Sequence, residues 1–480
     1  MTRRGLLAGV APAFLRGQSA ARRNVLFIGV DDLRPQLGCY GDRFAKSPNI
    51  DGLASRGVTF DRAYCQQAVC GPSRSSLLTG LRPDTIRVYD LNTSFRVAVP
   101  DAVTLPQLFL NHGYHTENIG KIFHGTELMN DRRSWSVPER LNMVTKREQY
   151  ALTKNKPAED WTKTVATERA DVPDDGYIDG RVALDAVETL QRLKGKPFFL
   201  GVGITKPHLP FTAPGKYWDQ FNRAQLPLPP NLEWPKDAPR FAIPTYSELR
   251  SYADFPDEGP ISEAKMREAI HGYYAASSYA DACIGKVLNE LDRLGLRDNT
   301  VVVLWGDHGW HLGENTHWGK STNFEICTRV PMIVSAPGAG KAGVHSPALV
   351  ECVDMYPTLA ELCGLPAPST LEGTSMARLL KDPRRHWKTA AFSQYPRSSK
   401  TSVGSAAILG GDVMGYSMRT NDYRYNEWRD KGGHVLDTEL YDHIKDPAET
   451  VNVAGQASYG KVLTEMKKMM QAGWRGAQHV

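Results

Sequence analysis

Four continuous apolar runs recur along the first two thirds of the chain, at residues 24–30, 198–202, 300–305 and 331–334. Uninterrupted apolar residues are typical of strands that are buried on both faces, as parallel strands are. Between these runs, apolar residues recur at helical spacing over residues 182–193, and a longer helical pattern covers about 262–294. This alternation predicts an α/β fold with a large, mostly parallel sheet sandwiched by helices.

The last hundred residues predict a smaller unit. Residues 382–385 (Asp-Pro-Arg-Arg) are typical of a linker, and the strand-like pieces 416–419 and 423–425 precede a helical pattern near 459–472. We therefore expect a main domain over residues 22–385 and a C-terminal α+β subdomain over 386–480. The Pro-rich stretch 208–260 is too long for a simple connection, so it is expected to form loops that shape a site.

The N-terminus predicts export. Arg3 and Arg4 precede a short apolar run that ends at Leu15, and small residues follow it. This order is typical of a signal peptide of the twin-arginine type, here residues 1–21, and it predicts a periplasmic or extracellular protein. An uncleaved tail is the alternative. The run is too short to span a bilayer, and no other stretch is long and apolar enough, so no membrane span is expected.

The amino-acid composition excludes few classes of binding partner. The chain has 58 Lys and Arg against 53 Asp and Glu, a formal net charge of +5. This excess is too weak to indicate a nucleic-acid-binding protein, and it suits either an acidic substrate or an ordinary solvated surface. Seven cysteines occur without a CxxC pair, so a zinc site is not indicated and the disulfide pairing cannot be deduced.

Acidic residues directly follow two of the predicted strands. Asp31 and Asp32 come after the first apolar run, and Asp307 and His308 follow the third. In open α/β sheets, ligands collect at the carboxyl ends of strands, and paired carboxylates are what hard divalent cations require. An Asp-Asp pair alone is also common turn chemistry, so the pair gains weight only with its neighbours.

The most specific motif is Cys70-Gly71-Pro72-Ser73-Arg74, followed by Leu-Thr-Gly at residues 78–80. Cys-x-Pro-Ser-Arg with Leu-Thr-Gly downstream marks a cysteine for oxidation to formylglycine by a maturing enzyme. The alternative is an ordinary buried cysteine at a helix N-terminus.

Cationic and imidazole groups complete the candidate site: Lys121, His124, His208 and Lys320. Taken singly, each lysine could be a solvated charge and each histidine a structural residue. Taken together, cations opposite a metal describe a site for an oxyanion.

The chain resembles the type I, formylglycine-dependent sulfatases of the alkaline phosphatase superfamily, and among them the iduronate-2-sulfatase branch. The matching stretches are residues 30–35, 66–70, 82–85, 306–310, 393–397 and 414–417. The match runs from about residue 24 to 452. It implies an alkaline phosphatase-like α/β domain and a C-terminal subdomain with a small antiparallel sheet.

The resemblance also implies a ligand set. One Ca²⁺ would be held by Asp31, Asp32, Asp307, His308 and the formylglycine made from Cys70. His308 stands where many sulfatases carry Asn, but the iduronate-2-sulfatase branch shares this histidine.

By the same resemblance, a hydroxyl of the hydrated formylglycine attacks the sulfur. Lys320 and His208 would hold the ester, and His208 would protonate the departing sugar oxygen. His124 would take a proton from the second hydroxyl so that sulfate leaves. Arg74 and Lys121 would steady the formylglycine and the developing charge.

The expected substrate is a sulfated oligosaccharide or polysaccharide, with a 2-O-sulfated uronate of the glycosaminoglycan type as the first choice. Arg34 could then pair with the sugar carboxylate and Trp310 could pack on a sugar ring, or both could be purely structural. Three alternatives stay open: a sulfatase for another polysaccharide, a phosphate or phosphonate monoester hydrolase on the same fold, and a carbohydrate-binding protein without activity.

Overall fold

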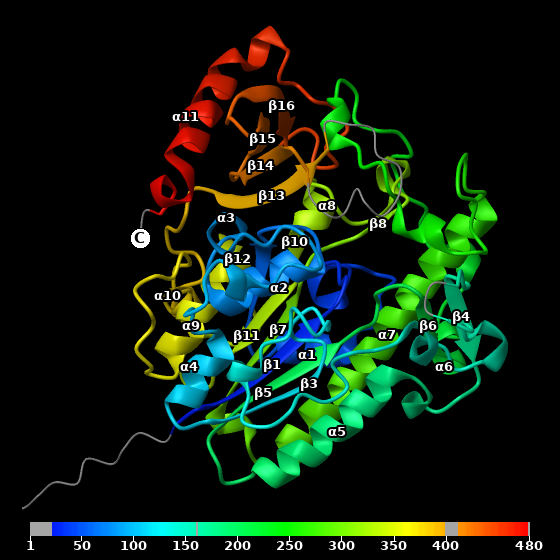
Figure 1. Cartoon of the computed structure of the whole chain (residues 1–480), viewed down its shortest axis with the longest axis vertical. Coiled ribbons are helices and arrows are strands. Elements are labelled where there is room, and N and C mark those ends of the chain that lie inside the picture. The colour runs from blue at the N-terminus through cyan, green and yellow to red at the C-terminus, as the bar shows by residue number, and fades with distance from the viewer. Residues whose placement is uncertain (1–21, 160–161, 399–410, 479–480) are drawn as a thin grey trace, which may run out of the picture.

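The computed structural model describes residues 22–159, 162–398 and 411–478. Within these ranges the largest unit is an eight-stranded sheet in the order β10-β2-β11-β7-β1-β5-β3, with β12 beside β2 (Figure 1). The predicted signal peptide, residues 1–21, lies outside the described residues. Among the described helices none has the length and apolar character needed to cross a membrane.

The middle of the sheet is parallel. β1 (Asn24–Val30) lies between β5 (Phe198–Ile204) and β7 (Thr300–Gly306), and every residue of these three strands is buried. This burial explains their uninterrupted apolar sequences. Val30 pairs with Ile204 on one side and with Gly306 on the other, so the three strands end at the same level.

The remaining strands of the sheet include both parallel and antiparallel ones. Its other strands are β2 (Val58–Tyr64), β3 (His115–Gly120), β10 (Arg329–Val330), β11 (Met332–Ser335) and β12 (Val344–Glu351). β3 and β12 join in parallel, whereas β10 and β11 run antiparallel to their neighbours. The sheet is therefore mostly parallel, as predicted.

Helices cover both faces of this sheet (Figure 1). Alternate residues of a strand point to opposite faces. Leu26 and Ile28 pack with α1 (Pro48–Ala54), α5 (Ile178–Leu193) and α7 (Glu263–Arg293). On the other face, the core contains side chains of α2 (Cys70–Thr79), α4 (Leu105–Asn111), α9 (Met355–Leu362) and α10 (Ala377–Lys381). The predicted α/β sandwich is confirmed.

The C-terminal part forms a four-stranded antiparallel sheet of β13 (Ala391–Arg397), β14 (Val413–Arg419), β15 (Tyr423–Asp430) and β16 (Val435–Asp442). The helix α11 (Gly460–Gly476) packs on it through Met466 and Met470. The expected small α+β unit is present, and its boundary at residue 386 stays a prediction.

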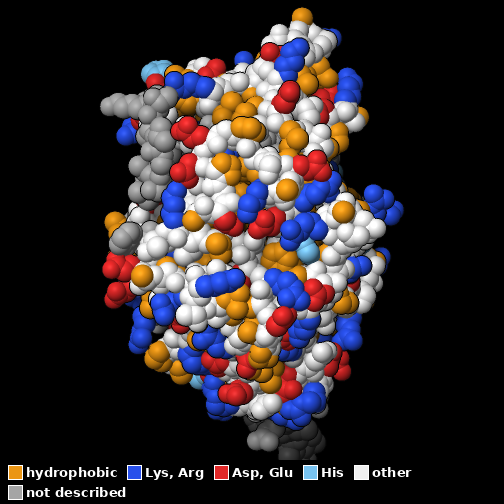
Figure 2. All heavy atoms as spheres, turned by 90° about the vertical axis from the view of Figure 1, so that its right-hand side faces the viewer, with side chains coloured by type: hydrophobic (Ala, Val, Ile, Leu, Met, Phe, Trp, Pro, Cys, Tyr) orange, Lys and Arg blue, Asp and Glu red, His pale blue; other side chains and the backbone are white. Residues whose placement is uncertain are grey.

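Residues 208–260 are mostly irregular. They contain only β6 (Phe211–Pro214), which pairs with β4 (Thr167–Ala170), the short α6 (Gly215–Trp218) and brief 3-10 turns. The remaining short α-helices and strands are α3 (Pro83–Ile86), α8 (Glu325–Thr328), β8 (His311–Leu312) and β9 (Trp318–Gly319). On the face shown in Figure 2, Lys and Arg are interspersed with Asp and Glu rather than gathered in one patch.

Candidate active site

The carboxylates predicted from the sequence meet at the carboxyl end of the central strands. Asp31 and Asp32 follow β1, and Asp307 follows β7. Asp32 has a φ of 57°, so the chain turns sharply there and two neighbouring side chains can face one point. The turn is held by the backbone N–H of Asp32, which donates to Oδ1 of Asp307 over 3.0 Å.

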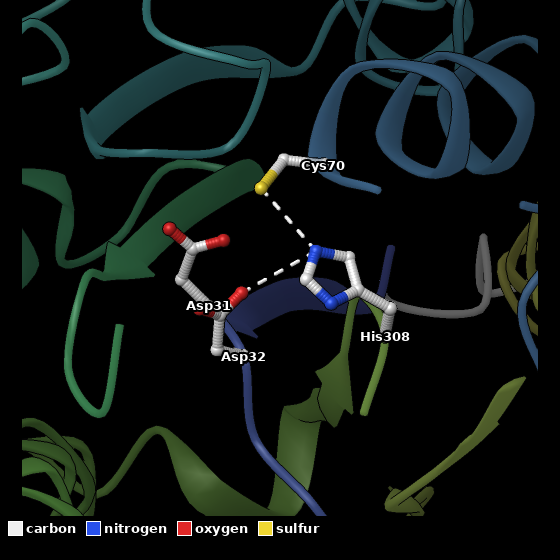
Figure 3. A group of neighbouring side chains, drawn as sticks. All are labelled: Asp31, Asp32, Cys70 and His308. Atoms are coloured by element: carbon white, nitrogen blue, oxygen red, sulfur yellow. Dashed lines mark hydrogen bonds and ion pairs between the residues drawn. The ribbon is translucent and has the colours of Figure 1, made fainter. Parts of the chain in front are cut away.

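Cys70 brings a sulfur to the same point from the first residue of α2 (Figure 3). Its Sγ lies 3.3 Å from Nε2 of His308. One ligand atom each from Asp31, Asp32, Cys70 and His308 lies within 4.8 Å of the others, and all four residues are buried. Four of the five predicted metal ligands therefore form one cluster.

The fifth predicted ligand, Asp307, is turned partly toward Arg74. Nε of Arg74 donates to Oδ2 of Asp307 over 2.8 Å, and its Nη2 donates to Oδ1 of Asp31 over 3.2 Å. Arg74 lies one helical turn after Cys70, so both face the site. Oδ2 of Asp307 lies 3.7 Å from Nε2 of His308 and thus borders the cluster.

Two lysines complete the charge balance. Nζ of Lys121 donates to Asp31 over 2.5 Å, and Nζ of Lys320 donates to Asp32 over 2.9 Å. Nζ of Lys320 also lies 3.7 Å from Sγ of Cys70. Although burial opposes its charge, Asp32 raises the pKa of Lys320 well above its usual range, so this ammonium stays protonated beside the cysteine.

Two histidines flank this group in neutral form. Burial lowers the pKa of His208 well below its usual range, with Lys320 adding to the effect, and burial with Lys121 does the same for His124. Nδ1 of His208 faces the carbonyl of Leu209, which only accepts, so Nε2 is the atom that gains or loses a proton in the site. Nδ1 of His124 is buried and has no hydrogen-bond partner among the described residues.

The donor set suits a hard divalent cation. Burial raises the pKa of Asp32 well above its usual range, and nearby carboxylates add to this despite the opposing charge of Lys320. A cation among these carboxylates would remove that repulsion. Burial also lowers the pKa of His308 to about 4, so its imidazole is neutral, as a metal ligand must be.

One acidic residue was missed. Glu248, in the irregular stretch 208–260, places Oε1 3.6 Å from Nε2 of His208 and Oε2 3.4 Å from Nζ of Lys320. The sequence around Glu248 carries no motif. Only its position in a stretch expected to shape a site pointed toward it.

The suggested sugar contact of Trp310 is not supported, and that of Arg34 stays a prediction. Trp310 has an exposed fraction of 0% and packs edge-on against Phe211, so a sugar cannot reach its ring. Nη2 of Arg34 is already bonded to Oε1 of Glu314 over 2.9 Å. Trp310 therefore has the structural role that is its alternative, and Arg34 forms the structural ion pair while its Nη1 has no hydrogen-bond partner among the described residues.

The comparison with protein families decides the affiliation. The Sulfatase family model matches residues 23–365, which is more than half of the chain and includes the whole cluster. The chain belongs to the sulfatase family. A second model, described as the C-terminal part of N-sulphoglucosamine sulphohydrolase, matches residues 313–475 of this sulfatase.

Relatives and solved structures agree with this assignment. The sulfatase is 35% identical to iduronate 2-sulfatase of Mus musculus, over 92% of this chain and 93% of that protein. It is 29% identical to a sulfatase of Formosa agariphila, over 93% and 86%.

Two solved structures share the fold. One is a protein in complex with D-glucosamine-2-N,6-O-disulfate, with a TM-score of 0.75 at 24% identity over 95% of this chain and 98% of that one. The other is a phosphonate monoester hydrolase from Silicibacter pomeroyi, with a TM-score of 0.78 at 23% identity over 95% and 96%. The expected alkaline phosphatase-like fold is thus confirmed.

Proposed function

We propose that this chain is an exported, Ca²⁺-dependent sulfatase that removes an O-sulfate from a sulfated sugar, with formylglycine made from Cys70 as its nucleophile. The observation that carries the proposal is the direction of the Cys70 side chain. It points from the start of α2 at Asp31, Asp32 and His308 (Figure 3). The Lys320 ammonium lies 3.7 Å from its sulfur. Export is supported by the twin-arginine-like pattern at residues 1–21.

An unmodified Cys70 would be a poor nucleophile in this setting. Burial raises the pKa of its thiol well above the usual range, and Asp31 adds to this, although Lys121 and Lys320 oppose it. Cysteine nucleophiles need the reverse, a lowered pKa. Conversion to formylglycine by a maturing enzyme instead supplies hydroxyls that do not depend on a thiolate.

Peptide mass spectrometry tests this conversion with an internal control. Cleavage after Arg62 and Arg74 releases residues 63–74, a peptide that contains both Cys65 and Cys70. In active protein, Cys65 should be alkylated as a thiol while Cys70 has the mass of an aldehyde or its hydrate. Fully active protein with two alkylated thiols in this peptide would refute the proposed nucleophile.

Asp31, Asp32, Asp307 and His308 would hold the Ca²⁺, which supplies positive charge for the nucleophilic hydroxyl and the sulfate oxygens. Despite its burial, Lys121 and Arg74 lower the pKa of Asp31 well below its usual range, so it stays ionised, and Arg74 also orients Asp307 through its hydrogen bond. These contacts hold the carboxylates in place before substrate arrives, so little reorganisation is needed during the reaction.

The remaining roles belong to groups that face the substrate. The ammonium of Lys320 binds a sulfate oxygen, and His208 holds the ester from the other side. His208 is neutral in the free site, but the negative charge of a bound sulfate raises its pKa, so that Nε2 can protonate the departing sugar oxygen. His124 is neutral and its Nδ1 has no hydrogen-bond partner among the described residues, so it can accept the proton of the second formylglycine hydroxyl, which must leave before sulfate is released.

The substrate we propose is a 2-O-sulfated uronate. Its support is the 35% identity to iduronate 2-sulfatase over more than nine tenths of both chains. The test compares desulfation of a 2-O-sulfated uronate disaccharide with that of sulfated hexosamines and of neutral galactose sulfates. Preference for the neutral sugars would refute the uronate while leaving the sulfatase assignment intact.

A phosphonate monoester hydrolase is the second candidate, because a protein of that name shares this fold with a TM-score of 0.78. Fold likeness does not fix the reaction. Parallel rates on sulfate and phosphonate esters separate the two candidates.

A further inference from the structure

Lys320 is followed by a residue in a strained conformation. Ser321 has a φ of 78°, in the left-handed region that favours glycine. Such conformations persist only where the surroundings enforce them, and they concentrate at functional sites. The backbone N–H of Ser321 donates to the carbonyl of Ala68 over 3.1 Å, which ties it to the loop that enters Cys70.

The other side of Ser321 is held from the C-terminal sheet. Nη2 of Arg397, the last residue of β13, donates to the carbonyl of Ser321 over 2.6 Å. Nε of Arg397 donates to the carbonyl of Phe241 over 3.0 Å, and its guanidinium lies 4.6 Å from the ring centre of Tyr395. The side chain is thereby fixed at several points.

Arg397 is an unusual buried cation. Only 8% of the residue is exposed, and no carboxylate among the described residues forms an ion pair with it. Burial lowers its pKa to about 10, so it still carries its charge at neutral pH. A buried charge that binds carbonyls instead of an acid is costly, which points to a role beyond packing.

We propose that Arg397 is a positioning residue that holds Ser321 in its left-handed conformation and thereby places the Lys320 ammonium beside Cys70. The inference rests on the proposed function, in which Lys320 binds sulfate. Charge-assisted hydrogen bonds are the strong ones, so the bond from Arg397 can hold a strained residue. The C-terminal sheet then helps to position the site through this one residue.

The neighbouring contacts agree with this role. The carbonyl of Lys320 lies 2.9 Å from Nε2 of His317, so the peptide unit between Lys320 and Ser321 is also held. Nζ of Lys320 then falls 2.9 Å from Asp32 and 3.7 Å from the sulfur of Cys70. Loss of the anchor at Ser321 would let the lysine backbone relax and its ammonium shift.

The main test measures kcat and KM for 4-nitrophenyl sulfate in Arg397→Gln and Arg397→Lys. Arg397→Gln should lower kcat/KM by roughly 10- to 100-fold, the size expected when a group shifts by about 1 Å, and Arg397→Lys by less. Arg429→Gln is the matched control: Arg429 lies on β15 of the same sheet and pairs with Glu427. It should have no effect.

A double-mutant cycle separates positioning from general damage. In the Lys320→Ala background, Arg397→Gln should lower kcat/KM by less than about threefold, because residues that act as one unit are not additive. In the Ser321→Gly background its effect should also shrink, since glycine adopts a positive φ without strain. If Arg397→Gln lowered kcat/KM equally in the parent, in Lys320→Ala and in Ser321→Gly, the proposal would be overturned.

A crystal structure of Arg397→Gln distinguishes a failure of the proposed function from a failure of the positioning role. If the parent protein hydrolyses no sulfate ester, the proposed function is wrong, but the structure still tests positioning. The Lys320 ammonium should then lie outside hydrogen-bond distance of Asp32. An unmoved Lys320 would refute the role of Arg397 alone.

Discussion

Replacing Arg74 by methionine tests the metal site through stability. Arg74 is fully buried and donates to Asp307 over 2.8 Å and to Asp31 over 3.2 Å. Its removal leaves two buried carboxylates with fewer positive neighbours. Breaking a buried ion pair in this way costs about 3–5 kcal/mol, so we expect Arg74→Met to lower the free energy of unfolding by that amount in chelator.

Calcium should reduce this cost. A cation held by Asp31 and Asp307 replaces part of the charge that Arg74 supplied, so the variant should bind Ca²⁺ more tightly than the parent. A tenfold gain in affinity is about 1.4 kcal/mol, and the cost of Arg74→Met should shrink by roughly that much in Ca²⁺. Urea unfolding with Ca²⁺ and with chelator measures both values.

A second buried arginine provides the control. Nη1 and Nη2 of Arg82 each donate to Glu351 over 2.8 Å, outside the cluster of predicted ligands. Arg82→Met should therefore cost the same free energy with and without Ca²⁺. If the cost of Arg74→Met were equally insensitive to Ca²⁺, the reasoning that places the cation among these carboxylates would be refuted.

Two further predictions concern the site and a third concerns a buried histidine near it. Asp307→Asn should lower both the bound Ca²⁺, measured by elemental analysis, and the turnover rate, and full metal content would contradict its role as a ligand. Lys320→Ala should lower kcat/KM for 4-nitrophenyl sulfate by about 10²–10³-fold, and an unchanged rate would exclude it from sulfate binding. Burial lowers the pKa of His311 to about 3, against about 6.5 in the unfolded chain, so the stability it contributes is present above pH 6.5 and lost as the pH falls toward 3, at up to about 1.4 kcal/mol per unit. Urea unfolding at pH 7 and 5 should show a shallower decline for His311→Gln, and an equal decline would contradict this assignment.

The sequence predicted the parts of the fold that depend on local patterns. β1, β5 and β7 are buried on both faces, so their apolar runs identified them directly. The antiparallel direction of β11 could not be deduced, because a four-residue apolar run does not encode the strand's direction. The convergence of Asp31 and Asp32 needed a turn that only the positive φ of Asp32 revealed.

Long-range contacts account for what the sequence did not predict. Glu248 lies in no recognisable motif, and Arg397 ends a matching stretch that gave no hint of its contact with the site; both reach the site because loops and β13 fold back against residues 317–321. A sugar contact for Trp310 is suggested by its place shortly after Asp307 and His308. Proximity along the chain does not fix side-chain direction, and the indole packs inward beside Phe211.

The most direct test of the account compares kcat/KM for 4-nitrophenyl sulfate and 4-nitrophenyl phenylphosphonate on one preparation in Ca²⁺. The two esters share a leaving group, so the ratio reports which centre the site is built to attack. A sulfatase should hydrolyse the sulfate ester with the higher kcat/KM, and the rate should vanish in Cys70→Ala. A higher kcat/KM on the phosphonate would contradict the account and favour the phosphonate monoester hydrolase reaction on this same fold.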